Sequence, residues 1–434
     1  MALVDGARRW SFAEFAAEVE ALTSALAASG ARVGSVVSAQ LPNWWETAAL
    51  FWATFRLGAT LNPILPIFRR RELGFILKEA RSELLFVPGV YRGFDHRALA
   101  AELASDAPSL REVVVVRHET ERPLTSWREF RSRRGATPRP PSAADVALLM
   151  YTSGTTADPK GVLHSHDALL YETRSLVGAH ALGSSDVVLM PSPLTHVSGL
   201  NHAALAPFLL GTRAILAESW NPEAALATIA AEQVTYMVGA PVFLADLLRE
   251  PRFDALALAS FRLFSCGGAG VPVDLLREAT ARIGCVAKRV YGSTEMPTLT
   301  TSMPDDPLEL AVTTEGRPIG AAELRIVDDA ERDLPAGSEG EILCRGPELF
   351  LGYRDDRLDA PAFTADGWFR TGDLGVVRDD GALVVTGRKK DVVIRKGEKI
   401  SAAEVEAAIE RHPAIHAAAI VALPDPATGE RACA

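Results

Sequence analysis

The segment YTSGTTADPKGV spans Tyr151–Val162 and directly follows an apolar run, Val146–Met150. An apolar run that leads into glycine, serine and threonine indicates a buried strand followed by an exposed turn. Backbone N–H groups in such a turn can converge on a phosphate, because glycine tolerates unusual dihedral angles and has no side chain to block the approach. Lys160 adds a positive charge for phosphate oxygens.

This segment differs from the common nucleotide P-loop. That loop ends in Gly-Lys-Ser/Thr, whereas the corresponding residues here are Pro159-Lys160-Gly161, so a Walker motif is excluded. Taken alone, the segment fits a plain polar loop equally well. Its interpretation as a phosphate-binding loop therefore depends on what else the chain contains.

Five further segments rich in glycine, small polar and charged residues follow. They are PLTHVSG (Pro193–Gly199), SCGGAG (Ser265–Gly270), VYGSTE (Val290–Glu295), WFRTGD (Trp368–Asp373) and GRKKD (Gly387–Asp391). In this order the six segments closely resemble the adenylate-forming superfamily, which includes acyl-CoA synthetases, nonribosomal-peptide adenylation domains and firefly-type luciferases. One segment alone is a weak signal, but six in order are very specific. The resemblance extends from about Val4 to the last residue.

The composition is typical of a globular enzyme. The chain has 434 residues, 48% of them hydrophobic and 23% charged, which is enough to build several cores. A net charge of −10 argues against a general nucleic-acid-binding protein. Only seven lysines occur, and four of them lie between Lys389 and Lys399. This cluster fits a solvated surface or a local site for an anion.

The cysteines and the apolar runs indicate a reducing compartment. Cys266, Cys285, Cys344 and Cys433 show no CxxC spacing, so neither a disulfide framework nor a zinc site is expected. The first six residues do not resemble a signal peptide, and no apolar run is long enough to span a membrane. We expect a cytoplasmic protein, and the sequence leaves the oligomeric state open, a homodimer included.

Alternating strand and helix patterns predict an α/β fold. Ser11-Phe12-Ala13-Glu14 is a capping box that begins a helix reaching about Gly30, and an amphipathic helix is expected over 44–57, ending at Gly58. Apolar runs at 36–41, 113–116, 187–189, 214–216, 234–238 and 263–266 are typical of strands in a mostly parallel sheet. Thr137–Pro141 is expected to be a surface linker.

The pattern changes towards the C-terminus. Turn-rich strands from about residue 308 to 388 predict a small β-rich subdomain at the end of a large domain, 1–388. A second capping box at Ser401 and a strand over 416–423 predict a small α+β domain, 389–434. The resemblance implies that this small domain continues in the family and carries a lysine that assists adenylation. We therefore expect a truncated small domain, impaired adenylation and retained nucleotide binding.

The resemblance implies that a carboxylate attacks the α-phosphate of ATP, that pyrophosphate leaves, and that a thiol then takes the acyl group. Glu295 is suited to hold Mg²⁺, which prefers carboxylate and phosphate oxygens. Thr294 is suited to the α-phosphate, Lys160 to the phosphates, and His196 to a place beside the reacting carboxylate. These four are the predicted catalytic residues. A solvated turn carboxylate is the plainer interpretation of Glu295 alone.

The predicted nucleotide contacts are spread over several segments. The phosphate loop would contribute Thr152, Ser153, Gly154, Thr155 and Thr156. Tyr291 and Gly292 are expected beside the adenine, with Gly267, Gly268 and Ala269 on its other side, because glycines let the backbone approach a planar ring. Asp373 is expected to accept both ribose hydroxyls, with Arg388 in support. Ordinary packing or surface roles are the alternatives.

For the second half-reaction the resemblance implies a hinge at Lys390 and a loop at Gly397 beside the path of CoA. A nonpolar acyl pocket is expected from His202, Val238 and Ala240, with Ala203, Ala204 and Phe243 nearby; core packing is the alternative. None of these residues is acidic, which argues against an α-amino acid as substrate. Residues 41–46 and 62–68 resemble cyclohexanecarboxylate-CoA ligases.

Two other functions stay open. In the first, the acyl group passes to the phosphopantetheine of a carrier protein instead of CoA. In the second, the chain binds ATP and AMP without full turnover.

Overall fold

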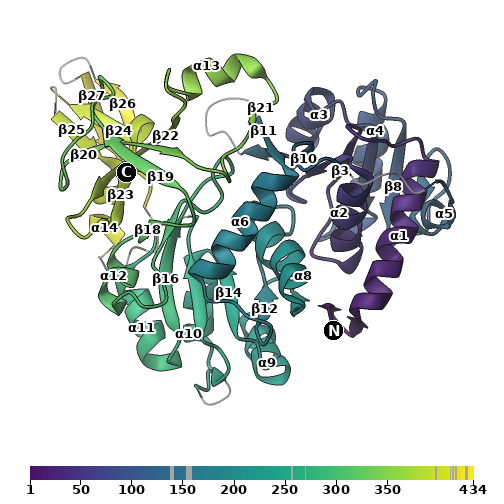
Figure 1. Cartoon of the computed structure of the whole chain (residues 1–434), viewed down its shortest axis with the longest axis horizontal. Coiled ribbons are helices and arrows are strands. Elements are labelled where there is room, and N and C mark those ends of the chain that lie inside the picture. Colours follow the sequence, from purple (N-terminus) through teal and green to yellow (C-terminus); the bar gives the residue numbers. More distant parts are fainter. Residues whose placement is uncertain are drawn as a thin grey trace.

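The computed structural model describes residues 1–136, 141–152, 159–255, 258–268, 270–395, 398–410, 412, 415, 418–425 and 429–434. Within this part of the chain, two large sheets lie side by side with helices around and between them, and the chain ends in smaller sheets at one side (Figure 1). The mixed α/β fold class is confirmed.

The first large sheet has nine strands among the described residues. Their order is β18 (Arg317–Pro318), β17 (Thr300–Thr301), β16 (Val286–Tyr291), β15 (Leu263–Cys266), β14 (Tyr236–Gly239), β12 (Val187–Met190), β13 (Arg213–Leu216), β1 (Leu3–Asp5) and β2 (Arg8–Trp10). The central strands from β16 to β1 run parallel, and the edge strands are antiparallel. Its helices are α6 (His166–Ala179), α8 (Ala206–Leu210), α9 (Pro222–Glu232), α10 (Pro241–Arg249), α11 (Val273–Ile283) and α12 (Leu308–Thr313).

The second large sheet has eight strands in the part that the structure describes. Their order is β21 (Gly352–Tyr353), β11 (Lys160–Ser165), β10 (Val146–Thr152), β4 (Thr60–Pro63), β3 (Val36–Ala39), β5 (Leu84–Pro88), β8 (Glu112–Val116) and β9 (Thr125–Ser126). Strands β10 and β11 form an antiparallel hairpin. The helices here are α1 (Phe12–Ala28), α2 (Trp45–Leu57), α3 (Arg70–Glu79), α4 (His96–Ala104) and α5 (Trp127–Ser132). A short hairpin, β6 (Val90–Tyr91) and β7 (Phe94–Asp95), precedes α4.

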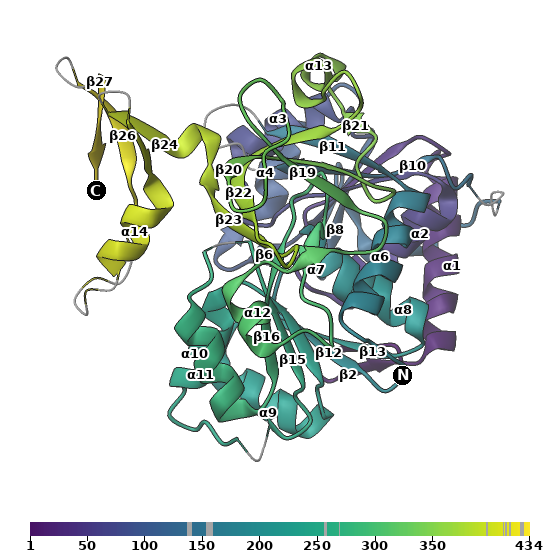
Figure 2. The ribbon, with the colours of Figure 1, turned by 60° about the vertical axis from the view of Figure 1, so that its left-hand side comes forward.

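Two small antiparallel sheets complete the chain. The first consists of β19 (Glu323–Val327), β20 (Glu339–Arg345), β22 (Phe369–Val377) and β23 (Leu383–Arg388). The second consists of β25 (Glu398–Ser401), β24 (Val392–Arg395), β27 (Gly429–Cys433) and β26 (Val421–Asp425), with helix α14 (Ala402–Glu410). Figure 2 shows this last sheet and α14 standing out to one side of the molecule. The proposed boundary at 388/389 lies where β23 ends, and it stays a prediction.

Helix α6 packs between the two large sheets. Its Leu169 and Leu176 belong to one buried apolar cluster with Leu148 of β10 and with Val188 and Tyr236 of β12 and β14. The helix follows β11 directly, and Ser165 caps its first turn by accepting a hydrogen bond from the Ala168 N–H. The position of α6 therefore depends on the β10–β11 hairpin that contains the phosphate segment (Figure 1).

Most expected elements are present. Ser11 and Glu14 form both halves of the capping box, and α2 ends at Gly58 in the left-handed conformation. The strand expected over 234–238 is instead Tyr236–Gly239, because Val234 closes the turn after α9. The strand expected at 416–423 begins at Val421, and β27 was not predicted. Residues 137–140 of the expected linker lie outside the described residues.

No helix among the described residues combines the length and the apolar character that crossing a membrane requires.

Gly316 provides a test of how closely neighbouring segments at the edge of the first large sheet approach each other. It has φ +76° between α12 and β18, and a Cβ there would lie 2.0 Å from the carbonyl carbon of Thr301. Gly337 has φ +82°, with no atom within 4 Å of its hypothetical Cβ. We predict that Gly337→Ala costs about 1–2 kcal/mol, the cost of the left-handed conformation alone, whereas Gly316→Ala costs clearly more.

Urea unfolding of the two variants measures both costs. Equal losses of unfolding free energy would mean that the contact at Gly316 relaxes without cost.

Candidate active site

The phosphate segment is the hairpin between β10 and β11. Thr152, the last residue of β10, pairs with Lys160, the first residue of β11. Burial of Ala147 to Tyr151 explains the strand, and Lys160 is exposed where the chain returns. Ser153, Gly154, Thr155 and Thr156 lie outside the described residues. The structure therefore places Thr152 and Lys160 together at the base of the predicted loop.

The turn that carries Thr294 and Glu295 follows β16. Ser293 closes it: the Ser293 N–H donates to the Met296 carbonyl at 2.9 Å, and the Ser293 hydroxyl oxygen accepts from the Glu295 and Met296 N–H groups at 3.2 Å each. Gly292 is required because a Cβ there would lie 2.1 Å from the Pro297 carbonyl oxygen. These contacts hold the half-buried Glu295 in one backbone conformation.

Tyr353 connects the phosphate hairpin with this turn. It lies on β21, paired with Val162 of β11, and its hydroxyl donates to Glu295 Oε1 at 2.8 Å. The Lys160 Nζ lies 5.1 Å from the centre of the Tyr353 ring, a cation–π contact. Lys160 and Glu295, which were predicted separately, thus meet at one aromatic side chain. We did not predict Tyr353, because its role depends on strand pairing that no local pattern shows.

His164 contacts the backbone of the Thr294–Glu295 turn. It is fully buried on β11, and its Nε2 lies 2.8 Å from the Thr294 carbonyl oxygen. Burial lowers the pKa of His164 to about 4, so the ring is neutral at pH 7. Because a carbonyl oxygen only accepts, Nε2 carries the hydrogen. His164 is therefore a structural support of this turn.

The predicted ribose acceptor lies where β22 and β23 pair. Asp373 is opposite Arg388 in the register, and the Arg388 Nε lies 3.0 Å from Asp373 Oδ1. The Tyr291 hydroxyl donates to Asp373 Oδ2 at 2.7 Å. Burial raises the pKa of Asp373, while the Tyr291 hydrogen bond and the Arg388 charge act in the opposite direction. The structure therefore brings together three residues that were predicted from three separate segments.

The glycine segment after β15 lies at the carboxyl ends of the parallel strands. The Gly267 N–H donates to the Gly239 carbonyl oxygen at 3.3 Å, and a Cβ on Gly267 would lie 2.6 Å from the Val290 carbonyl oxygen. Gly268 has φ +78°, and Ala269 lies outside the described residues. Ligands of parallel α/β sheets commonly bind at this edge.

The residues predicted to contact the acid differ in how deeply they are buried. His196 is exposed, and its Nδ1 accepts from the Ser198 N–H at 3.3 Å. Val238 is buried at the end of β14, and Ala240 is half-buried just beyond it. His202 is buried in the π-helix η1 (Leu200–Leu205), where its ring stacks on that of His180, the residue after α6, with ring centroids 5.5 Å apart. Burial lowers the pKa of His202 to about 3, and this surrounding fits core packing.

Two buried carboxyl groups lie near the turn, and we did not single them out from the sequence. Glu172 of α6 accepts the Thr298 hydroxyl at 2.6 Å, and Glu348, in the loop before β21, has no hydrogen-bond partner for either carboxyl oxygen among the described residues. Burial raises the pKa of Glu172 to about 8 and that of Glu348 to about 7. The charge of Glu348 also raises the pKa of Glu172.

The predicted hinge follows β23. Lys390 lies in the short 3-10 turn Lys389–Asp391, and the neighbouring Lys389 pairs with Glu341 at 2.9 Å and Asp329 at 3.2 Å. Gly397 lies outside the described residues. The hinge and CoA-side roles stay predictions.

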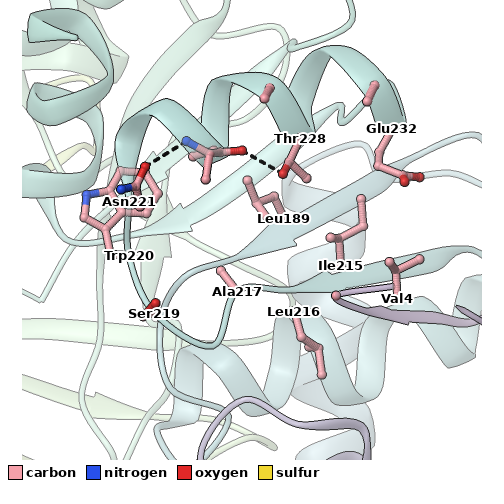
Figure 3. A pocket seen from close by; sticks show the side chains of 15 residues that line it. Val4, Leu189, Ile215, Leu216, Ala217, Ser219, Trp220, Asn221, Thr228 and Glu232 are labelled. Carbon is pink, nitrogen blue, oxygen red and sulfur yellow. Dashed lines mark hydrogen bonds between the residues drawn. The ribbon is translucent and has the colours of Figure 1, made fainter. Parts of the chain in front are cut away.

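A separate groove of about 390 Å³ lies between α9 and strands β1, β12 and β13 (Figure 3). Apolar residues such as Leu189 and Ile215 form its floor, with Trp220 and Glu232 towards its two ends. The residues that line it include none of those predicted for nucleotide or acid.

A model of AMP-binding enzymes matches residues 1–354. The chain belongs to the AMP-binding enzyme family. Among its relatives, the medium-chain fatty-acid–CoA ligase of Escherichia coli (strain K12) is 36% identical over 95% of this chain and 74% of that protein. The 2-hydroxy-7-methoxy-5-methyl-1-naphthoate–CoA ligase of Streptomyces carzinostaticus is also 36% identical, over 99% of this chain and 80% of that protein.

A solved structure of this family has the same fold. ATP-bound MatB from Rhodopseudomonas palustris superposes with a TM-score of 0.90 at 27% identity, over 99% of this chain and 84% of that one. The resemblance inferred from the six segments is confirmed at the level of the family.

Glu348 allows a prediction about pH and stability. Its raised pKa favours the protonated form in the folded protein, so its contribution is complete below the unfolded pKa near 4.5 and is lost as pH rises through about 7. Between these values the loss approaches about 1.4 kcal/mol per pH unit. We predict that Glu348→Gln, which is neutral at every pH, weakens the fall in melting temperature between pH 6 and pH 8.

Glu339→Gln, at an exposed position, serves as the control and should follow the wild type. If Glu348→Gln also follows the wild type, Glu348 is not protonated in the folded protein at pH 6.

Proposed function

We propose that this chain joins a nonpolar carboxylic acid to AMP and then transfers the acyl group to the thiol of CoA. The observation that carries the proposal is the convergence of Tyr291, Asp373 and Arg388, beside the meeting of Lys160 and Glu295 at Tyr353. The first group offers an aromatic ring and a carboxylate to a nucleoside. The second offers a cation and a carboxylate to a metal–phosphate group.

In the first step an oxygen of the acid attacks the α-phosphorus of ATP, and the bond to pyrophosphate breaks. Both reactants are anions, so the site must position them and balance their charge. Lys160 and the phosphate hairpin would hold the phosphates, and the Thr294 hydroxyl would donate to the α-phosphate. Glu295 fits Mg²⁺, since its carboxylate is half-buried and held by Tyr353. When bound, Mg²⁺ supplies positive charge to the phosphates.

The adenosine would lie at the carboxyl ends of β15 and β16. Gly267 and Gly268 leave backbone exposed to a planar base, and Gly292 lets the neighbouring turn close onto the Pro297 backbone. Asp373 Oδ2 already accepts the Tyr291 hydroxyl and Oδ1 lies against the Arg388 guanidinium, and both oxygens keep lone pairs for ribose hydroxyls. The site therefore selects a nucleotide through ordinary hydrogen-bond chemistry.

In the second step the CoA sulfur attacks the acyl carbon, and AMP leaves with the electrons of the broken C–O bond. Lys390 would be the hinge between the two steps and Gly397 would lie on the CoA side. His196, exposed near the acid side, would border the path of the thiol. We place the reaction in the cytoplasm, where ATP and CoA are available. A homodimer stays a prediction that light scattering would test.

The acid is expected to be nonpolar. Val238 lies near the end of β14, Ala240 follows this strand, and the Phe243 ring contacts Trp220 with ring centroids 4.8 Å apart. These side chains offer no carboxylate to an ammonium group, so an α-amino acid would bury an unpaired charge at a cost of several kcal/mol.

The direct test is an assay of pyrophosphate release with a panel of acids, followed by chromatography of acyl-CoA and AMP. Aliphatic, alicyclic and aromatic acids should be turned over, and amino acids should not. Parallel reactions with a phosphopantetheinyl carrier protein identify the acceptor. Acylation of the carrier without acyl-CoA formation would overturn the proposal of CoA, and binding of AMP without any pyrophosphate release would overturn the proposal of an enzyme.

Asp373→Asn tests the nucleoside site. The substitution keeps the shape of the side chain but removes the charge that pairs with Arg388 and accepts the ribose hydroxyls. We predict at least about a tenfold loss of AMP affinity in calorimetry, since a hydrogen bond to a charged group contributes about 1.5–3 kcal/mol. Asp380→Asn, in the turn before β23, is the control. Equal affinities for wild type and Asp373→Asn would remove Asp373 from the site.

Glu295→Gln tests the metal role. Removing one preorganised electrostatic group from such a site costs about 10²–10³ in rate. We predict a loss of this size in pyrophosphate release at saturating Mg²⁺, with Glu309→Gln on α12 as an exposed control. A loss under about threefold, which is below 1 kcal/mol, would contradict the assignment.

A further inference from the structure

Glu172 makes two hydrogen bonds that join distant parts of the chain. The Thr298 hydroxyl donates to Glu172 Oε1 at 2.6 Å, and the Asn201 Nδ2 donates to the same oxygen at 3.4 Å. All three side chains are buried. One carboxyl oxygen on α6 therefore contacts both the turn after β16 and the π-helix η1.

Each contacted segment is close to a predicted site. Thr298 is three residues beyond Glu295 and belongs to the same turn. Asn201 follows the segment of His196 and precedes His202. Helix α6 itself begins where β11 ends, and β11 begins at Lys160. The three segments that would meet the metal, the acid and the phosphates thus share one buried contact.

Stability alone does not account for this arrangement. A carboxyl group at this depth costs several kcal/mol to desolvate, and packed apolar side chains in its place are often neutral or stabilising. Glu172 Oε2 also has no hydrogen-bond partner among the described residues. What the group does provide is a fixed distance between Thr298 and Asn201, since both donate to one oxygen.

We propose that Glu172 is a positioning residue that holds the Thr294–Glu295 turn and the acid-side helix η1 in one relative geometry. This rests on the proposed function for the roles of the two segments. Reacting groups must be placed within about 0.5 Å for efficient catalysis, and a shared acceptor transmits a shift of one donor to the other. Because the pKa of Glu172 is raised, its carboxyl group is protonated at pH 7, and the carbonyl oxygen of this neutral group accepts both hydrogen bonds.

The experiment measures kcat and KM for variants that keep the side-chain volume but differ in hydrogen bonding. Glu172→Gln keeps an acceptor oxygen and should retain kcat and both KM values within about threefold. Glu172→Met keeps the volume and removes the acceptor, and it should lower kcat at least tenfold and raise the KM for the acid. Thr298→Val removes one donor and should lower kcat with little change in the KM for the acid. Thr173→Val, a buried threonine on α6 whose hydroxyl bonds only within its helix, is the control.

The double variant Glu172→Met/Thr298→Val decides between positioning and general destabilisation. If Glu172 acts through Thr298, adding Thr298→Val to Glu172→Met changes kcat less than twofold. The proposal would be overturned if the loss of kcat in the double variant equalled the product of the two single losses. Wild-type kinetics for a folded Glu172→Met would also overturn it. Melting temperatures identify variants that fail to fold, and Glu172→Gln with Thr298→Val then still test the contact.

Calorimetry with Mg-ATP separates this proposal from the proposed function. If no acid is turned over by the wild type, the proposed function fails. The positioning role is then tested by the affinity for Mg-ATP. Glu172→Met and Thr298→Val should each weaken binding, and the double variant should bind no more weakly than the weaker single variant. Glu172→Gln should not weaken binding. Unchanged affinity in all three would overturn it.

Discussion

The turn from Gly292 to Thr298 depends on hydrogen bonds from buried groups that have no access to water. The His164 Nε2–H donates to the Thr294 carbonyl, and the Phe350 N–H donates to the Glu295 carbonyl at 2.9 Å. The Thr298 hydroxyl donates to Glu172. A buried polar group that loses its partner costs about 1–3 kcal/mol. The turn is therefore held at three points, by strand β11, by the loop before β21 and by helix α6.

The two small-sheet residues Asp373 and Arg388 extend this arrangement towards the proposed nucleoside site. Their antiparallel pairing places them opposite each other, and the Tyr291 hydroxyl joins Asp373 to the end of β16. Lys288, buried on the same strand, donates to the Ala179 carbonyl at the end of α6 and to the Ser302 carbonyl. Burial lowers the pKa of Lys288 to about 8. Helix α6 thus contacts the turn after β16 from its middle, through Glu172, and β16 itself from its C-terminal end, through Ala179.

The sequence predicted the features that depend on local chemistry. The capping box at Ser11, the helix stop at Gly58 and the strand before the phosphate loop all follow from neighbouring residues, and they are present. The six ordered segments predicted the family. Tyr353, the His164–Thr294 contact and Glu172 were not predicted as parts of the site. Each depends on a partner more than fifty residues away, and no spacing rule relates positions brought together only by the packing of two sheets.

The same distinction applies to Tyr291, for which the sequence predicted one role and the structure shows a second contact. From the sequence, its ring is a surface for adenine, a role that needs only an aromatic residue after a strand. In the structure its hydroxyl also holds the carboxylate predicted for the ribose. Because the Asp373 side chain is buried, its charge is costly without donors. The Tyr291 hydroxyl supplies one donor and Arg388 supplies the opposite charge. A nucleotide that binds there meets a carboxylate already oriented, which reduces the entropy that binding must overcome.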